Sequence, residues 1–378
     1  MHVVVSKKDL LRVLARCQGV ADRKSTMPVL GNVLLETVDG GLRLAATDLY
    51  LAVSGRIEAT VQRKGSVALG ARDLFERVKM MPDGEVALDV TDGAATTIRA
   101  TGSARRYTVH GVPGAEFPSL PEPEASAEWL DLDVSIVSRL IAATQFSIST
   151  DETRLHLSSA LFEWDGDRVR MVSTDGHRLS KMELGVRGSR ATTSMLIPNK
   201  GVQELRRLCD EALSDAGEDT PKLRLVQSGP SVFFELAGFR FSVKLVDAQF
   251  PPYQQVIPAQ SERAVRAPRI LLSEALKAVR LAASDRTGGV KLTLSSGKIR
   301  VESESPEAGE GFDEVPVDYE GAEVTIGFNA SYFLDVLSAI PDDEVILGIS
   351  GELDPAVLQP GNESVERSYL AVVMPMRI

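Results

Sequence analysis

Apolar residues recur at helical spacing in three segments of the chain, each of which follows a short stretch of alternating apolar and polar residues. The three segments are Ser6–Asp22, Asp133–Ser149 and Arg269–Asp285. In the first, Leu10 and Leu14 lie four residues apart, a spacing that places both side chains on one face of a helix. The pattern predicts three amphipathic helices that each bury one side.

Strand patterns follow each of these helices. Runs that alternate between apolar and polar residues are separated by the turn dipeptides Asp39-Gly40, Asp165-Gly166 and Ser296-Gly297. Such dipeptides between alternating runs are typical of β-hairpins.

A second set of helical patterns comes later in each third of the chain, at Gly70–Met81, Pro198–Leu213 and Asn329–Ile340. Two of them end in closely related phrases, Met81–Val86 (MPDGEV) and Ile340–Val345 (IPDDEV). A proline after the last turn ends a helix, and the acidic residues that follow favour a turn into the next strand.

Both helix series repeat at roughly 130 residues, which is an ordinary length for one domain. Proline clusters at Phe117–Pro123 and Phe250–Tyr253 indicate extended linkers between the repeats. The prediction is an α+β fold made of three tandem copies of one unit, at residues 1–123, 124–252 and 253–378. A non-repeating α+β protein is the alternative, but element order, length and terminating phrase recur together.

The composition is that of an ordinary globular protein, with 43% hydrophobic and 25% charged residues among 378. No apolar run approaches the roughly 20 residues of a membrane span, and the N-terminus lacks the features of a signal peptide. Cys17 and Cys209 are too few for a disulfide framework. We therefore expect a reduced, cytoplasmic setting without a membrane partner. The net charge of -11 by itself argues against binding of nucleic acid. It is a sum over the whole chain, however, and does not show where the charges lie.

Motifs for catalysis are missing. The four histidines, His2, His110, His156 and His177, show no metal-ligand spacing, and no nucleophile elbow or phosphate loop is present. Asp175-Gly176-His177 is a candidate for general-base chemistry, although a lone histidine in a turn is more commonly a packing or hydrogen-bonding residue. The sequence favours a binding protein with no catalytic residue, cofactor or metal.

Several phrases occur in order along the repeats: Met27–Asn32 (MPVLGN), Ala46–Asp48 (ATD), Ser173–Leu179 (STDGHRL), Phe250–Pro258 (FPPYQQVIP), Gly327–Tyr332 (GFNASY) and Val372–Ile378 (VVMPMRI). With them the chain resembles, over essentially its whole length, the bacterial sliding clamp, the beta subunit of DNA polymerase III. The resemblance implies a head-to-tail homodimer whose six units form a ring around duplex DNA. Such a ring tethers the polymerase and gives it processivity without catalysing a reaction itself.

By this resemblance Lys24, Arg72 and Lys200 are the expected contacts to the DNA backbone. Lys24 stands where arginine is common, which keeps the charge but weakens a bidentate phosphate contact. The helices also carry Lys7, Lys8, Arg12 and Arg16, which supports a basic inner layer.

Opposite charges on the first and third repeats favour head-to-tail pairing over self-pairing. For the charged part of the dimer interface we expect Arg106 opposite Glu302 and Glu304. For its apolar part we expect Met81 and Val109 opposite Leu281 and Ala282.

The resemblance further implies a pocket between the second and third repeats for short apolar motifs of the polymerase III alpha subunit, the clamp loader and other replication and repair proteins. Matching residues are Leu157, Thr174, Gly176, His177, Arg178, Leu179, Pro251, Gln255, Val256, Asn329, Tyr332, Val372, Val373, Met374, Pro375, Met376 and Arg377. Methionine and aliphatic side chains suit a floor that adapts to several partners, and Arg178, Asn329 and Arg377 offer donors to a peptide. Gln255 departs from the family, where arginine is frequent.

Three alternatives stay open at this point. One is a specialised clamp paralogue for resistance or repair, for which Gln255 is the sequence hint. Another is an enzyme that uses the Thr174–Arg178 turn, and the last is an interaction scaffold that does not bind DNA.

Overall fold

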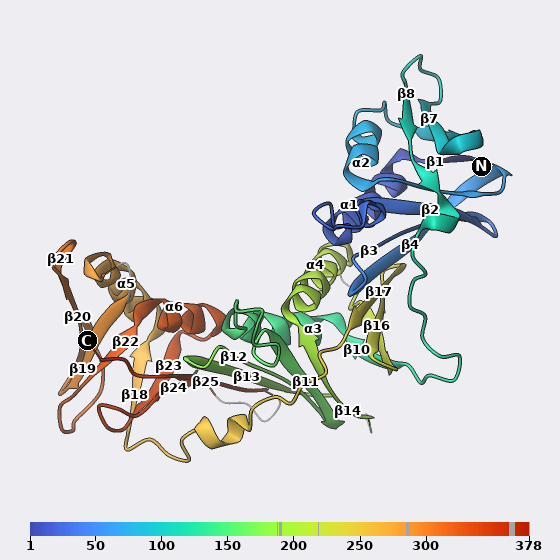
Figure 1. Ribbon diagram of the computed structural model, residues 1–378. Coiled ribbons are helices and arrows are strands. Elements are labelled where there is room, and N and C mark those ends of the chain that lie inside the picture. The colour runs from blue at the N-terminus through green and yellow to red at the C-terminus, as the bar shows by residue number, and fades with distance from the viewer. Residues whose placement is uncertain (187, 189–190, 218, 285–287, 363–366, 378) are drawn as a thin grey trace. The chain divides into compact units, whose positions relative to one another are not determined.

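The structure is a computed structural model that describes residues 1–378 except 187, 189–190, 218, 285–287, 363–366 and 378 (Figure 1). It divides into two compact units, residues 1–135 with 207–245 and residues 136–206 with 246–378. The boundary runs through the second repeat. Asp285 and Ile378, which end two of the segments expected from the sequence, lie outside the described residues.

All six predicted helices are confirmed. They are α1 (Lys7–Val20), α2 (Ala71–Lys79), α3 (Val134–Thr144), α4 (Asn199–Asp215), α5 (Arg269–Val279) and α6 (Ala330–Ala339). The α-helical parts of α3 and α5 end earlier than expected, because each chain segment tightens into a 3₁₀ turn, η4 (Gln145–Ser147) and η6 (Arg280–Ala282). Ser6 begins α1 as an N-cap, since its hydroxyl accepts from the Asp9 N–H at 3.4 Å.

In the first unit the described strands form one 13-stranded sheet. Its strands are β1 (His2–Ser6), β2 (Asn32–Val38), β3 (Gly41–Thr47), β4 (Leu51–Arg63), β5 (Ser66–Gly70), β6 (Glu85–Val90), β7 (Ala95–Ala100), β8 (Arg106–His110), β9 (Val112–Pro113), β10 (Leu130–Asp133), β15 (Lys222–Ser228), β16 (Ser231–Leu236) and β17 (Phe239–Lys244). The first repeat's β4 pairs antiparallel with β17 of the second. Gly55 permits this pairing, since a Cβ there would approach Phe239 and Val13 to 3.0 Å.

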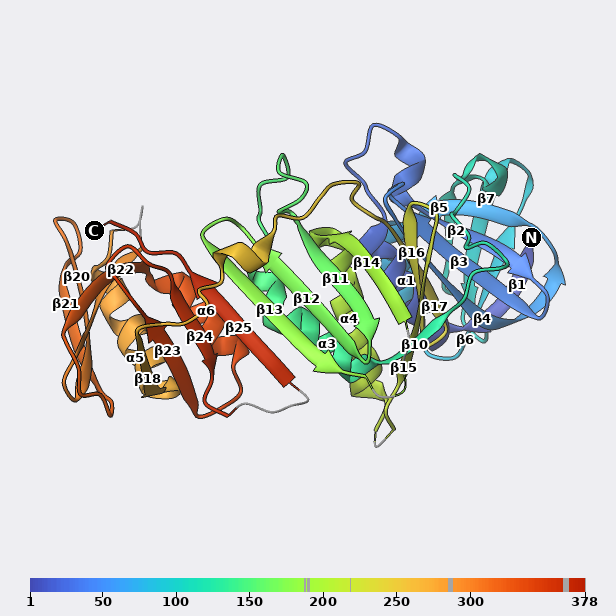
Figure 2. The same ribbon diagram turned by 90° about the horizontal axis from the view of Figure 1, so that it is seen from below.

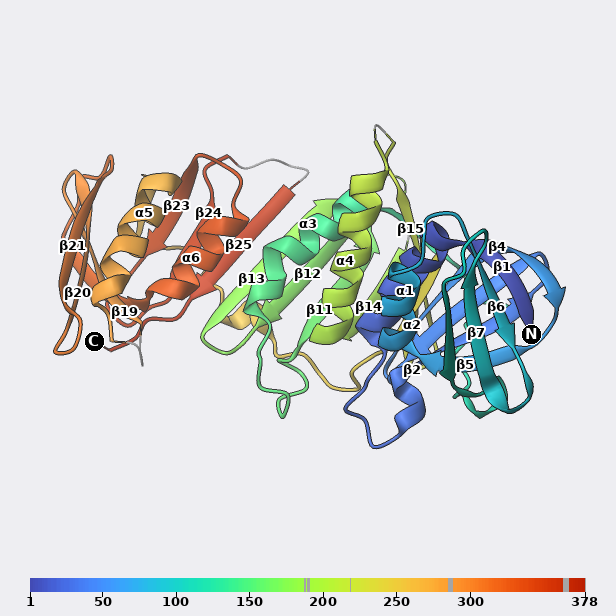
Figure 3. The same cartoon turned by 90° about the horizontal axis from the view of Figure 1, so that it is seen from above.

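In the second unit an eight-stranded sheet has the order β14 (Ala191–Pro198), β11 (Ser159–Gly166), β12 (Arg168–Thr174), β13 (Arg178–Gly185), β25 (Arg367–Val373), β24 (Ala356–Pro360), β23 (Glu344–Ile349) and β18 (Arg263–Pro268). A four-stranded sheet has the order β21 (Gly309–Pro316), β20 (Lys298–Ser305), β19 (Gly289–Ser295) and β22 (Val324–Asn329). Figure 2 shows the larger sheet from the face opposite to α5 and α6, and Figure 3 shows these two helices on the other face.

The predicted hairpins are also confirmed. Gly40, Gly166 and Gly297 connect β2 to β3, β11 to β12 and β19 to β20, with φ of 71°, 61° and 77°. Glycine reaches this left-handed region without the steric cost that a Cβ adds. Since the same hairpin opens each repeat, the strands that follow it, β4, β13 and β21, are structurally equivalent.

One rule connects successive repeats. The strand after the first hairpin pairs with the last strand of the next repeat: β4 pairs with β17, and β13 pairs with β25. In the described part of the chain, two strands are sheet edges without such a partner: β21 of the third repeat, and β8, which is the first repeat's equivalent of β17 and β25. No helix among the described residues is long and apolar enough to cross a membrane.

Candidate functional site

The turn at Thr174–Arg178 is fixed by its own side chains. The Thr174 hydroxyl donates to the Arg178 carbonyl at 2.7 Å, while Asp175 Oδ1 accepts from the His177 and Arg178 N–H groups at 2.9 and 3.0 Å. Gly176 takes φ of 92°. Threonine and aspartate favour such turns because they mimic backbone hydrogen bonds. The turn leaves His177 exposed at its tip.

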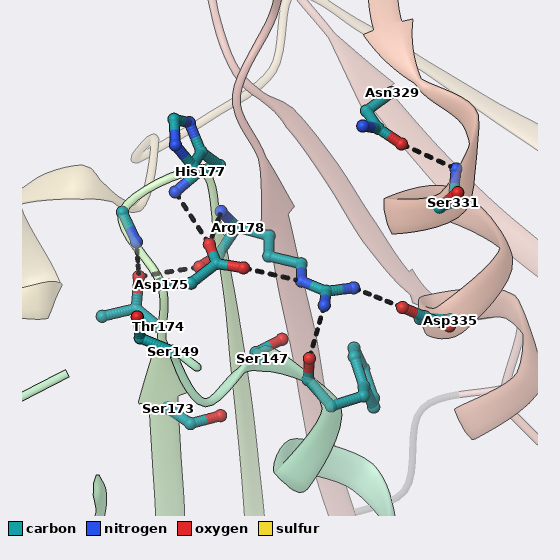
Figure 4. Close-up of polar contacts among 12 residues, drawn as sticks. Ser147, Ser149, Ser173, Thr174, Asp175, His177, Arg178, Asn329, Ser331 and Asp335 are labelled. Atoms are coloured by element: carbon teal, nitrogen blue, oxygen red, sulfur yellow. Dashed lines mark hydrogen bonds and ion pairs between the residues drawn. The ribbon is translucent and has the colours of Figure 1, made fainter. Parts of the chain in front are cut away.

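Arg178 is held by three elements of the second unit (Figure 4). Its Nε donates to Asp175 Oδ2 at 3.1 Å, its Nη1 to Asp335 Oδ2 of α6 at 2.5 Å, and its Nη2 to the Phe146 carbonyl at 2.5 Å. The guanidinium also lies 4.5 Å from the Tyr332 ring centroid. Each guanidinium nitrogen thus donates within the chain. A donor role toward a peptide stays a prediction, since Nη1 and Nη2 each carry a second N–H.

An apolar floor lies beside this turn. Leu179 of β13 and Val372 of β25 are directly paired across the two repeats. Both are buried in a cluster that also contains Leu161, Val172, Leu196 and Tyr253. Leu157 is buried as well. Apolar side chains from neighbouring strands therefore form one buried cluster at the junction of the second and third repeats.

The linker between these repeats packs on the same cluster. It forms a 3₁₀ turn, η5 (Tyr253–Val256), in which Tyr253 is buried and its hydroxyl lies 3.5 Å from Glu163 Oε2. Burial is the main cause that raises the pKa of Tyr253. With Tyr253 as the anchor, Gln255 and Val256 remain exposed and Pro251 is half-buried. The neutral Gln255 thus leaves this rim without a charge at that position.

The C-terminal tail borders the site on another side. The Met374 N–H donates to the His177 carbonyl at 2.8 Å, and the Met376 N–H donates to the Gly327 carbonyl at 2.8 Å. Val373 is buried, whereas Met374 is 40% exposed, and Pro375 and Met376 are half-buried. Arg377 is exposed. The tail therefore presents apolar side chains while its backbone is tied to the turn and to β22.

The start of α6 supplies two more expected residues. Asn329 caps this helix, since its Oδ1 accepts from the Ser331 N–H at 2.9 Å. Tyr332 is half-buried and stacks with the His177 ring at a centroid distance of 6.3 Å. Burial and the charge of Asp175 raise the pKa of Tyr332, while Arg178 lowers it.

The structure thus brings His177, Arg178 and Tyr332 together beside the Leu179 and Val372 floor. It also reveals Asp335 and Phe146, which the sequence reasoning missed. The signal for Asp335 was its position three residues after Tyr332, on the same face of α6.

The geometry of the turn does not suggest catalysis. Asp175 Oδ1 bonds backbone N–H groups, and its Oδ2 pairs with Arg178 rather than with the His177 imidazole. Within the described residues, no group of three or more His, Cys, Asp or Glu side chains is arranged to hold a metal ion.

Comparison with known proteins gives the family. The N-terminal, central and C-terminal domains of the DNA polymerase III beta subunit match residues 1–121, 131–252 and 254–377. The beta sliding clamp of Escherichia coli K12 is 33% identical over 381 residues, covering 100% of both chains. The chain belongs to the beta sliding clamp family of DNA polymerase III.

Solved structures agree with this. A DNA polymerase sliding clamp from Pseudomonas aeruginosa superposes with a TM-score of 0.91 at 31% identity, and a sliding clamp from Bartonella birtlesii with 0.92 at 30% identity. Each comparison covers 100% of both chains. As a beta sliding clamp the chain is a processivity subunit without a catalytic site of its own. The full-length relatives do not favour a specialised paralogue.

The expected DNA contacts of this beta sliding clamp are exposed. Lys24 lies in the turn after α1, and Arg72 and Lys200 lie in the first turns of α2 and α4. Arg72 and Arg23 line a depression of about 230 Å³.

Three other basic residues of α1 have partners within the clamp chain. Lys7 pairs with Asp83 at 2.9 Å, Arg12 lies over the Phe239 ring, and Arg16 pairs with Glu211. The basic character expected of this helix is therefore partly neutralised.

The expected dimer residues differ in exposure. Arg106, Glu304 and Leu281 are exposed, and Val109 and Glu302 are half-buried. Met81 and Ala282 are buried within their own chain, at 3% and 6% exposure. The sequence reasoning missed Phe312 of β21, which is 60% exposed. An apolar residue within an acidic edge strand was the available signal.

Proposed function

We propose that two of these chains close head to tail into a ring through β8 and β21. Duplex DNA then passes through the ring. The pocket at the second and third repeats binds short apolar segments of partner proteins. The proposal rests mainly on the pairing rule between repeats. Two of the three equivalent strands pair with the last strand of a following repeat. The remaining strand, β21, and β8, the first repeat's equivalent of β17 and β25, complete the rule when they come from different chains.

Unpaired edges of this kind are a physical reason to dimerise. A sheet edge exposes a row of backbone N–H and C=O groups that readily pair with another strand. Because β8 and β21 are different surfaces, their pairing is heterologous, and it closes into a ring only when the rotation between chains permits.

Side-chain direction supports the same pairing. In β21, Phe312 and Glu310 lie opposite Glu302 and Glu304 of β20, so all four share one face of that sheet. In β8, Arg106 lies opposite Arg99, on the exposed face of its sheet. A continuous sheet places Arg106 beside this acidic face and against the exposed Phe312 ring.

The opposite face supplies apolar contact. Val109 and Tyr107 of β8 lie opposite Thr96 and Ile98, which are fully buried. On the corresponding side of β21, Gly311 allows η6 to approach, since a Cβ there would lie 3.0 Å from the Ala282 Cβ. Leu281 of η6 is 79% exposed. We expect Leu281 to bury against Val109, with Met81 and Ala282 behind them inside each chain.

For DNA we propose contacts from Lys24, Arg72 and Lys200 to phosphates. Such contacts carry charge but no base recognition, which suits a ring that slides on any sequence. The overall net charge of -11 is compatible with this when the acidic residues lie away from the DNA.

The partner pocket is proposed from its chemistry. A buried aliphatic floor with a few oriented polar groups is the usual form of a site for apolar ligands. We propose the alpha subunit of polymerase III, the clamp loader and other proteins with a clamp motif as its ligands. Sliding clamps from Pseudomonas aeruginosa and Bartonella birtlesii, 31% and 30% identical to this chain, are known bound to griselimycin.

Two measurements test the ring. Native mass spectrometry is expected to give twice the mass of the single chain, and electron microscopy is expected to show a particle with a central hole.

A third experiment tests the linkage to DNA. After loading by a clamp loader, the protein should stay on nicked circular DNA through gel filtration and be released when the circle is linearised. A monomer without a hole contradicts the ring, and equal retention on linear DNA contradicts topological linkage. No retention on either DNA favours a scaffold that does not bind DNA.

A further inference from the structure

Arg178 connects elements that are far apart in the sequence. It begins β13 in the second repeat, and its partners lie in the preceding turn (Asp175), after α3 (Phe146) and in α6 of the third repeat (Asp335). Of these three partners, Asp335 is the one that comes from the third repeat. The 2.5 Å contact between Nη1 and Asp335 Oδ2 therefore ties α6 to the turn of the pocket.

The guanidinium is costly to leave without partners, because its side chain is only 12% exposed. Asp175 is similarly enclosed at 15%, whereas Asp335 is 45% exposed. Loss of the Asp335 charge therefore leaves the buried pair of Arg178 and Asp175 intact. We expect the fold to tolerate that loss, while the tie to α6 disappears.

The contact between Arg178 and Asp335 matters because Tyr332 lies on the same helix as Asp335. This residue precedes Asp335 by three positions, so both project from the same side of α6. The Tyr332 ring lies 4.5 Å from the Arg178 guanidinium carbon and stacks with His177. The position of α6 relative to Arg178 thus determines how the Tyr332 and His177 rings are oriented beside the pocket floor.

We propose that Asp335 is a positioning residue for partner binding: through Arg178 it holds Tyr332 against His177 in the conformation that the apolar ligand requires. Asp335 does not belong to the floor or rim described above, and it acts through Arg178 and not by touching the ligand. The inference rests on the proposed peptide pocket and deepens it.

Griselimycin and the purified polymerase III alpha subunit serve as probes in titration calorimetry with the full-length protein. Asp335→Asn is expected to weaken both about tenfold, which corresponds to about 1.4 kcal/mol. Asp335→Glu keeps the carboxylate and should recover most of the affinity. Arg178→Lys should resemble Asp335→Asn, and the double variant should bind no worse than the weaker single variant, because the two residues act as one unit.

A matched control is available in the same repeat. Asp342 forms two hydrogen bonds with Arg367, at 3.1 and 2.9 Å, and it is not a pocket residue. Asp342→Asn weakens an ion pair whose carboxylate is 9% exposed, against 45% for Asp335, so it controls for general destabilisation. We expect it to lower the melting temperature while the affinity for griselimycin stays unchanged.

The outcomes separate the two proposals. Wild-type affinity of Asp335→Asn, or additive losses in the double variant, overturns the role of Asp335 and leaves the pocket standing. An equal loss of affinity in Asp342→Asn also overturns it, because general destabilisation then explains the effect. A wild-type protein that binds neither probe overturns the pocket itself, and the role of Asp335 with it.

Discussion

The backbone carbonyls of Tyr50 and His177 make the same contact in two different repeats. The Tyr50 carbonyl accepts from the Lys244 N–H at 2.8 Å, and the His177 carbonyl accepts from the Met374 N–H at 2.8 Å. Both residues follow a Thr-Asp pair and a residue of positive φ, Leu49 at 75° and Gly176 at 92°. The first repeat therefore contains a copy of the pocket turn in which tyrosine replaces histidine.

This copy provides a control for the pocket. His177→Ala removes the ring that stacks with Tyr332 and is expected to weaken griselimycin and alpha-subunit binding about three- to tenfold, within the range of an aromatic pair. Tyr50→Ala changes the equivalent tip, which is 66% exposed, and should leave both affinities unchanged. Calorimetry on both variants measures this. Equal losses in the two variants would mean that the effect is not local to the pocket.

The dimer contact is expected to depend on Phe312. Phe312→Ala removes an exposed aromatic side chain next to the unpaired edge of β21, and we predict that it raises the dimer dissociation constant at least tenfold, as loss of an interface anchor does. Analytical ultracentrifugation measures the constant. Tyr50→Ala serves again as a control, since Tyr50 is similarly exposed, at 66% against 60%, and belongs to neither β8 nor β21.

Charge exchange tests the same interface in a second way. Arg106→Glu places like charges together and should weaken the dimer, and Glu304→Arg should do so too. The protein that carries both changes restores opposite charges in a head-to-tail contact and should recover dimerisation in part. If the double variant is weaker than both single variants, Arg106 and Glu304 do not face each other.

The contribution of Arg72 to DNA binding is expected to be electrostatic. Arg72→Ala and Lys24→Ala should each lower binding to duplex DNA independently of its sequence and reduce the slope of log K against log salt by about 1. Fluorescence anisotropy across a salt series measures the slope. Lys64→Ala is the control, because Lys64 is an exposed lysine that is not among the expected DNA contacts. Sequence-dependent losses would argue against backbone contacts.

Removal of the C-terminal tail should separate partner binding from ring formation. A chain that ends at Val373 keeps β25 and its pairing with β13 but lacks the partly exposed Met374 and its neighbours. We expect binding of the alpha subunit to be abolished while the dimer keeps its mass in ultracentrifugation. If the dimer dissociates to the same extent as partner binding is lost, the assignment of the tail to the pocket is wrong.

The two thiols should be unreactive in the folded protein. Burial raises the pKa of both Cys17 and Cys209 from 9.0 to about 12. At pH 8.5 an unfolded chain has a substantial thiolate fraction, whereas the folded chain has almost none, and the thiolate is the reactive form. Iodoacetamide should therefore modify neither thiol in native protein and both in urea, as read by mass spectrometry. Because folding raises the pKa of both thiols, only the thiols of the unfolded chain ionise as the pH rises above 9. The free energy of unfolding therefore falls in that range.

The sequence by itself determined the local elements and their repetition. Helical spacing such as that of Leu10 and Leu14 and turn pairs such as Asp39-Gly40 report on interactions within a few residues, so the helices and hairpins were predictable. The recurrence of the same order of elements showed three repeats, and ordered phrases such as Ser173–Leu179 indicated the family. These features depend on backbone preferences and on side-chain periodicity, which neighbouring residues set.

Only the tertiary structure shows which distant segments of the chain pack against each other. The pairing of β4 with β17, the contact of Arg178 with Asp335 and the burial of Met81 depend on residues distant in the sequence. Periodicity shows that a side chain faces a core or solvent, but it does not show which strand edge finds a partner. For this reason the contact of Arg178 with Asp335 was not predicted, and Phe312 was overlooked. Contacts between distant segments arise only when the folded chain brings their edges together, and that information is spread over the whole sequence.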